Sequence, residues 1–90
     1  MKSKEFDIPG IYYFEAKNIF SGSGAGGKFN FRLNPVKNDG MINLVIWYGE
    51  KAYDLSEIVF EEDFELSESG YQTALSRLDE KFESFLKDKQ

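Results

Sequence analysis

The chain has 90 residues, 41% of them hydrophobic and 17% aromatic, which is enough for one small domain with a single core. It contains neither cysteine nor histidine, which excludes disulfides, thiolate metal sites and nucleophiles activated by histidine. The formal net charge of −5 is a poor match for a nucleic-acid backbone, so we expect no nucleic-acid partner.

The N-terminal segment, MKSKEFDIPG, carries charges but no apolar signal-peptide core. No apolar run approaches the roughly 18 residues that a membrane span requires. We therefore expect a cytoplasmic protein that does not cross a membrane. A single domain is expected over residues 1–90, in which residues 1–9 form a loosely ordered arm.

The first predicted strand covers Ile11 to Phe20, because this segment is rich in aromatic and β-branched residues. A glycine-rich stretch over residues 22–28, GSGAGGK, follows it. Its glycines match G-x-G-x-x-G, and residues 22–28 also match G-x-x-x-x-G-K, so a nucleotide site has to be considered.

Both phosphate-binding motifs require a helix after the glycines, because its N-terminus binds the anion. Here FNFRL follows and alternates as a strand, and Phe29 replaces the hydroxyl residue that binds magnesium. Kinases do place such glycines in a hairpin, but the other kinase motifs are missing. We predict a flexible hairpin loop over residues 22–28, with weak nucleotide or anion binding as an alternative.

Two further strands are predicted from Lys28 to Asn34 and from Met41 to Tyr48, with a turn at residues 38–40 between them. The first alternates strictly between apolar and polar residues. If its phenylalanines face the core, Val45 and Trp47 of the second strand point to the opposite face.

The segment from Ala52 to Leu66 has apolar residues in two phases. Tyr53 and Leu55 share one phase. Four residues share the other: Ile58, Phe60, Phe64 and Leu66. One flat strand cannot bury both sets, so we predict a bulge or turn near residues 56–57.

The last predicted element is a helix over residues 69–88, with a capping box at Ser69 and Gln72. Its apolar residues form one stripe at helical spacing: Tyr71, Ala74, Leu75, Leu78, Phe82, Phe85 and Leu86. Because the strands all precede it, the expected fold class is α+β. We predict an antiparallel four- to five-stranded meander with this helix packed on one face.

The second sheet face, opposite the helix, is one candidate interaction surface. It carries Val45 and Trp47, together with either Tyr12 and Phe14 or Ile11 and Tyr13. If exposed, it would bind a partner or form a homodimer. The alternative is that the sheet curls, or that the segment containing Phe6 and Ile8 covers this face.

An acidic run is the other candidate surface. No basic residue lies between Lys51 and Arg77, and residues 54–90 hold four basic and eleven acidic residues, a net charge of −7. The carboxylates of this run are Asp54, Glu57, Glu61, Glu62, Asp63, Glu65 and Glu68. They lack the spacing of a calcium loop and form no recognisable catalytic pair. They suit a basic partner, or they form a solvated edge strand that discourages aggregation.

We therefore predict a non-enzymatic protein-interaction or accessory module without cofactor or metal. One alternative is an acidic inhibitor that imitates a nucleic acid and blocks a basic partner. The candidate interaction residues are Tyr13, Val45, Trp47, Asp54, Glu57, Glu61, Glu62, Asp63 and Glu65.

Overall fold

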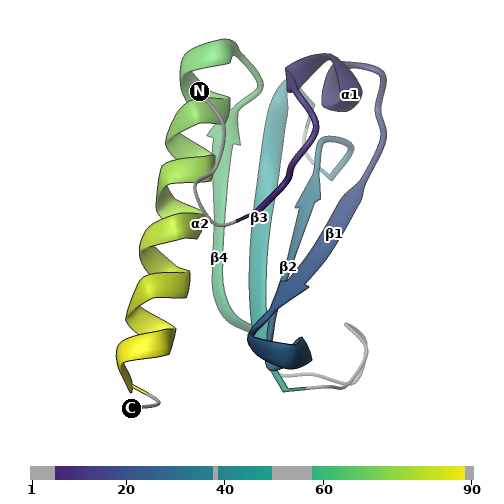
Figure 1. Cartoon of the computed structure of the whole chain (residues 1–90). Coiled ribbons are helices and arrows are strands. Elements are labelled where there is room, and N and C mark those ends of the chain that lie inside the picture. Colours follow the sequence, from purple (N-terminus) through teal and green to yellow (C-terminus); the bar gives the residue numbers. More distant parts are fainter. Residues whose placement is uncertain (1–5, 38, 50–57, 89–90) are drawn as a thin grey trace.

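The computed structural model describes residues 6–37, 39–49 and 58–88. Its elements are α1 (Ile11–Glu15), β1 (Phe20–Gly24), η1 (Ala25–Gly27), β2 (Phe29–Asn34), β3 (Met41–Tyr48), β4 (Ile58–Glu65) and α2 (Glu68–Asp88). The strands form one antiparallel sheet in the order β1-β2-β3-β4, and α2 packs on one face of it (Figure 1). The predicted α+β fold is confirmed, with four strands.

The core lies between the sheet and α2, where the predicted alternation of the strands is also confirmed. In β2, Phe29, Phe31 and Leu33 are fully buried, and the residues between them are not. From α2, the rings of Phe82 and Phe85 lie 4.9 and 5.5 Å from the ring of Phe29. Aromatic pairs at such distances add to the stability given by burial alone.

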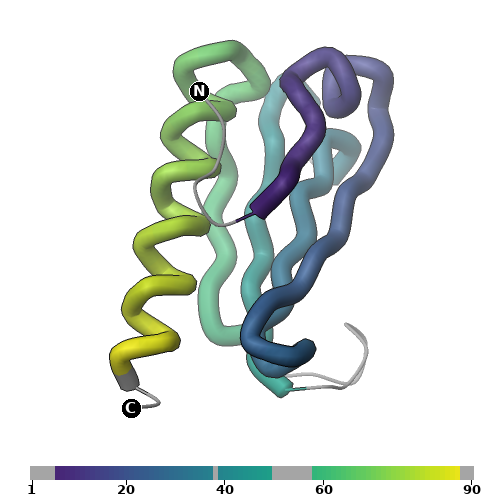
Figure 2. Tube along the Cα trace, viewed as in Figure 1, coloured from purple at the N-terminus to yellow at the C-terminus, as the bar shows by residue number. Residues whose placement is uncertain are grey.

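One face of the sheet is covered by two different segments, because the backbone of α2 lies mainly over β3 and β4. The segment that runs from Phe6 to α1 passes between α2 and β1 (Figure 2). The ring of Phe6 lies 4.8 Å from that of Phe31 and 5.0 Å from that of Phe82, and Ile8 is buried. This segment therefore completes the core, and the alternative that it covers the second sheet face is wrong.

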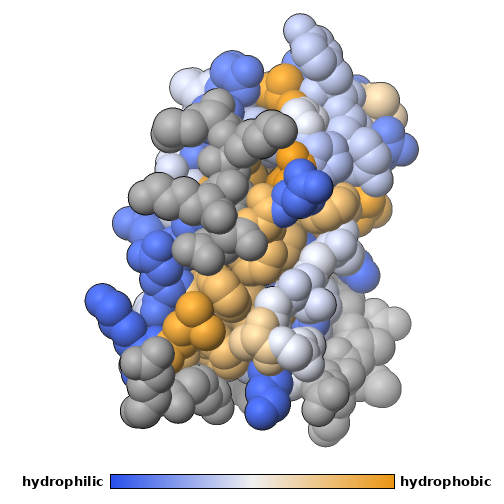
Figure 3. All heavy atoms as spheres, viewed as in Figure 1, coloured by the Kyte–Doolittle hydropathy of each residue, from blue (hydrophilic) through white to orange (hydrophobic). Residues whose placement is uncertain are grey.

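Apolar atoms remain visible on this side of the molecule, between α2 and β1, while hydrophilic residues line α2 (Figure 3). Several side chains packed against the core are accordingly only partly buried, among them Phe6, Phe20 and Leu86. A chain of this size has too few residues to enclose its core fully.

The predicted strand from Ile11 to Phe20 is wrong, because residues 11–15 form the short helix α1 and β1 begins only at Phe20. In this helical turn Phe14 is fully buried, with its ring 5.4 Å from that of Tyr71, while Tyr12 is 82% exposed. Strand propensity is a weak preference, and burial of Phe14 outweighs it.

Strand β4 contains a bulge. Phe60 pairs with Ile46 but Ile58 pairs with Trp47, so Val59 has no partner of its own. Ile58 therefore lies on the second sheet face, and the prediction that it shares a face with Phe60 is wrong. The bulge expected near residues 56–57 lies outside the described residues; the observed one follows it.

The predicted C-terminal helix is confirmed, but its cap is not the predicted one. The first helical N–H···O bond runs from Tyr71 to the carbonyl of Ser67 (2.8 Å), and the N–H of Gly70 donates to the Ser67 hydroxyl (3.2 Å). Ser67 is thus the N-cap, and the capping box at Ser69 and Gln72 is wrong. The helix begins earlier because Gly70 lets its first turn approach the end of β4 closely.

The glycine-rich stretch does form a hairpin, but only residues 25–28 connect the strands. Gly22 and Gly24 belong to β1, where aromatic rings lie over the backbone. A β-carbon on Gly22 would lie 2.6 Å from Cζ of Phe31, and one on Gly24 would lie 2.9 Å from Cε1 of Phe82. These two glycines therefore serve the packing of the core.

Tyr71 links α2 to the N-terminal segment, because its hydroxyl donates a hydrogen bond to the carbonyl of Pro9. Burial, and to a lesser degree the charge of Glu68, raises the pKa of Tyr71 to about 12. The pKa of Tyr71 is higher in the folded chain than in the unfolded chain, so its contribution to stability is fully present below the unfolded pKa of about 10. This contribution is lost as the pH rises through the folded pKa of about 12.

We therefore expect the free energy of unfolding to fall between about pH 10 and pH 12. Tyr71→Phe should remove this part of the pH dependence and cost about 1 kcal/mol at neutral pH through the lost hydrogen bond. Urea unfolding at pH 7 and pH 11 tests both effects. Tyr12→Phe, at an exposed position, is the control. An unchanged alkaline slope in Tyr71→Phe would show that other groups cause it.

Candidate interaction surface

The second sheet face is largely polar. Three rows of residues cross the strands there: Ser21, Arg32, Val45 and Glu61; Asn34, Asn43 and Asp63; and Ser23, Asn30, Trp47 and Ile58. Val45 and Trp47 do point away from α2, as predicted. They are only 1% and 6% exposed, however, so they offer almost no area to a partner, and the described residues of this face form no exposed aromatic patch.

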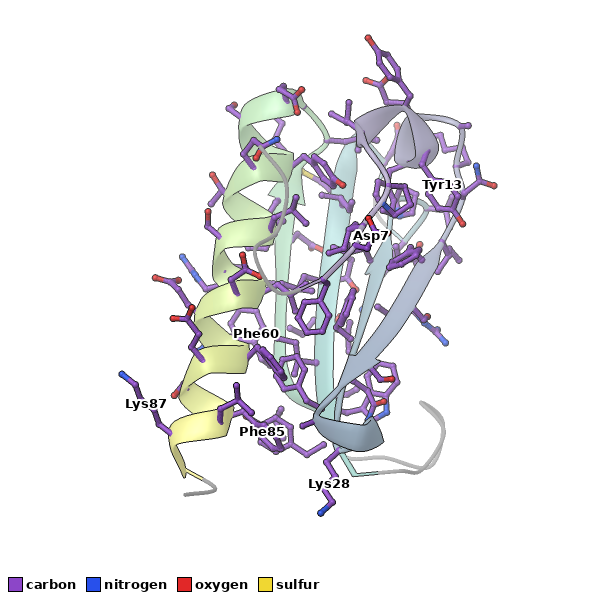
Figure 4. The ribbon with its side chains drawn as sticks, in the orientation of Figure 1. Asp7, Tyr13, Lys28, Phe60, Phe85 and Lys87 are labelled. Atoms are coloured by element: carbon purple, nitrogen blue, oxygen red, sulfur yellow. The ribbon has the colours of Figure 1, made fainter. Side chains whose placement is uncertain are left out.

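Tyr13 does not join Val45 and Trp47. It lies in α1 at one end of the sheet (Figure 4). Its ring meets those of Phe14 and Phe20 edge-on, at 5.1 and 6.2 Å, and its hydroxyl donates to the carbonyl of Ile19 (3.3 Å). Phe14 and Phe20 pack against the core on the α2 side of the sheet, so the expectation that Tyr13 shares the second face is wrong.

The acidic run does not form one surface, because neighbouring residues of a strand point to opposite faces. Glu61, Asp63 and Glu65 lie exposed on the second face, and we call these three residues the acidic row. Glu62 points to the α2 side, where the guanidinium of Arg77 binds its carboxylate at 2.7 Å. Asp54 and Glu57 lie outside the described residues.

Asn43 holds two carboxylates of the acidic row in place. This β3 side chain is 2% exposed, and its amide Nδ2 donates to Oδ1 of Asp63 (2.8 Å) and to Oε2 of Glu61 (3.2 Å). Like charges on one strand face repel each other, and a shared amide donor offsets this repulsion. The two carboxylates are therefore fixed before any partner arrives.

Lys37 adds a second contact to the row, since its ammonium pairs with the Glu61 carboxylate. This hydrogen bond, supported by that from Asn43, holds the pKa of Glu61 below its ordinary value of 4.5, although partial burial acts in the opposite direction. The two side chains are 45% and 39% exposed, so the pair adds little stability. Its effect is to keep Glu61 ionised and oriented.

Sequence reasoning identified the carboxylates of the row but missed Asn43 and Lys37. Asn43 did leave a signal, as the one strongly polar residue within the apolar run MINLVIWY of β3. A polar side chain on a buried strand needs a hydrogen-bond partner, which the neighbouring strand has to supply.

The hairpin loop lacks the geometry of a phosphate site. The three-residue η1 is followed by β2 and not by a helix, and the N–H of Lys28 donates to the carbonyl of Ala25 (3.4 Å). The Lys28 side chain points away from the domain (Figure 4). We therefore do not propose a nucleotide site there.

Comparison with models of protein families, with curated proteins and with solved structures found no match to this chain. Within the part of the chain that the structure describes, no helix is long and apolar enough to cross a membrane. The same residues contain no group of three or more acidic side chains arranged to hold a metal ion.

Proposed function

We propose that the domain is a small, non-enzymatic protein-interaction module that binds a basic segment of a partner protein through the acidic row. The observation that carries this proposal is the pair of hydrogen bonds from Asn43, which fix Glu61 and Asp63 side by side. Preorganised groups lose less conformational entropy on binding than mobile side chains do.

The spacing of the acidic row defines the chemistry of its partner. Alternate residues of a strand lie about 7 Å apart, so Glu61, Asp63 and Glu65 present carboxylates at that interval. Since β4 is the last strand of the described sheet, its outer backbone edge faces no further strand of that sheet. An extended segment with lysine or arginine at every second residue would match both the charges and the edge.

Titration with a ten-residue peptide of alternating lysine and threonine tests this proposal. Amide resonances of residues 58–65 should shift most. Removing three charges by Glu61→Gln, Asp63→Asn and Glu65→Gln should weaken binding by about tenfold or more.

A matched variant supplies the control. Asp79→Asn, Glu80→Gln and Glu83→Gln remove three charges from a shallow acidic depression on α2 and give the same net charge as the β4 variant. This control should keep most of the affinity. Equal weakening by the two variants would mean that net charge alone attracts the peptide, and the proposed site would then be wrong.

A second candidate function, an acidic inhibitor, is favoured by the same regular row. Fixed negative charges at one strand face resemble a charged backbone, and a protein whose basic groove holds nucleic acid would accept them. In that case the domain competes with nucleic acid for a captured partner. A captured partner that binds domain and nucleic acid together would contradict this second function.

A further inference from the structure

The two edges of the sheet differ in how they are protected. Natural edge strands discourage pairing with other chains by charged residues, proline or a bulge. Strand β4 has the bulge at Val59 and the acidic row, which repels a like-charged strand but attracts the basic segment proposed above. Strand β1, with the sequence FSGSG, has no charge and no proline, and its pairing with β2 is regular over all five residues.

We infer that two copies of this chain associate through β1, which pairs antiparallel with its own copy about a two-fold axis. The result is a continuous eight-stranded sheet. Such an axis keeps the equivalent faces of the two sheets on one side, so both copies of α2 cover the same face. Pairing centred on Gly22 uses the full length of β1.

This register is self-complementary on both faces. It places Phe20 of one copy opposite Gly24 of the other, on the α2 side, where Phe20 is only partly buried. The rings of Phe82 and Phe6 of the same chain already lie over Gly24, so the incoming Phe20 would pack beside these rings and bury more of its own surface. On the second face, Ser21 lies opposite Ser23; both are exposed in the single chain, and their hydroxyls can hydrogen-bond across the strands.

The charge distribution excludes a second copy from β4 but not from β1, which has no charged residue. Each copy carries a net charge of −5, and pairing through β4 would bring two acidic rows together. In a sheet paired through β1, seven strand spacings, about 33 Å, separate the two β4 strands. This exceeds the Debye length of about 8 Å at physiological salt, so pairing through β1 leaves the acidic rows screened from each other.

Cysteine cross-linking tests the register, because the chain has no cysteine of its own. Ser21→Cys and Ser23→Cys proteins, mixed and oxidised, should form a cross-linked dimer, since directly opposite strand residues lie within disulfide distance. Each protein oxidised alone should cross-link far less. Cross-linking within the Ser21→Cys protein alone, without the mixed product, would contradict pairing centred on Gly22.

Sedimentation equilibrium tests the association itself. The wild-type chain should dimerise, and Ser21→Lys with Ser23→Lys should raise the dimer dissociation constant at least tenfold. Ser69→Lys with Ser76→Lys, at exposed positions of α2, adds the same charge and should leave it unchanged. Circular dichroism verifies that each variant folds. A wild-type chain that stays monomeric at millimolar concentration overturns the inference.

Discussion

Replacing Gly70 by alanine is expected to destabilise the domain by about 3 kcal/mol, the upper end of the usual cost of overpacking. A glycine-to-alanine change inside a helix ordinarily stabilises it by about 1 kcal/mol, so the expected sign is reversed. At Gly70 an added β-carbon would lie 2.8 Å from the carbonyl carbon of Glu65 and nearer still to its oxygen. Both of these atoms belong to the backbone, so no side-chain rotation relieves the clash.

The first turn of α2 and the end of β4 would have to separate. Ser67 caps α2 and Glu65 ends β4, so moving the first turn of the helix strains the tight connection between them. Thermal unfolding should show a midpoint roughly 12–24 °C lower, from about 4–8 °C per kcal/mol in a domain of this size. Ser76→Ala, at an exposed position of the same helix, is the control and should be neutral or stabilising. A Gly70→Ala protein as stable as this control would show that α2 does not need its close approach to β4.

Most of the fold follows from periodicity in the sequence. The strict alternation of residues 29–34 identifies β2 and its buried face, and the apolar stripe from Tyr71 to Phe85 identifies α2 and the side it buries. These patterns are reliable because each repeats over several residues. In β2, a one-residue shift would also move the whole buried set to the opposite face.

The features that sequence reasoning missed depend on single contacts between distant residues. Helix α1 exists because Phe14 reaches Tyr71, and α2 begins at Glu68 because Gly70 fits against Glu65. Neither contact can be predicted from the local secondary-structure propensities of these segments. The same holds for the candidate site. Its carboxylates can be identified in the sequence, but the hydrogen bonds that Asn43 donates to them depend on the register between β3 and β4.

Gly22→Ala is expected to destabilise the domain by about 1–3 kcal/mol, since the new methyl group enters a packed core. The β-carbon would lie 2.6 Å from Cζ and 2.8 Å from Cε1 of Phe31. A ring tip often moves aside, but Phe31 is fully buried, and the rings of Phe6 and Phe20 lie 4.8 and 6.1 Å from it. Relieving the clash by moving the Phe31 ring would therefore displace the neighbouring rings of the aromatic core as well.

A double-mutant cycle separates this packing effect from the conformational freedom of glycine. Phe31→Leu shortens the side chain over Gly22, so Gly22→Ala should cost at least 1 kcal/mol less in that background. Gly10→Ala is the control, because a β-carbon there has open space around it and φ is −70°; it should be neutral or slightly stabilising. If the stretch GSGAGGK served only as a flexible hairpin tip, Gly22→Ala would behave like Gly10→Ala and show no coupling to Phe31. A coupled cost instead means that Gly22 is required because the ring of Phe31 lies against its bare backbone.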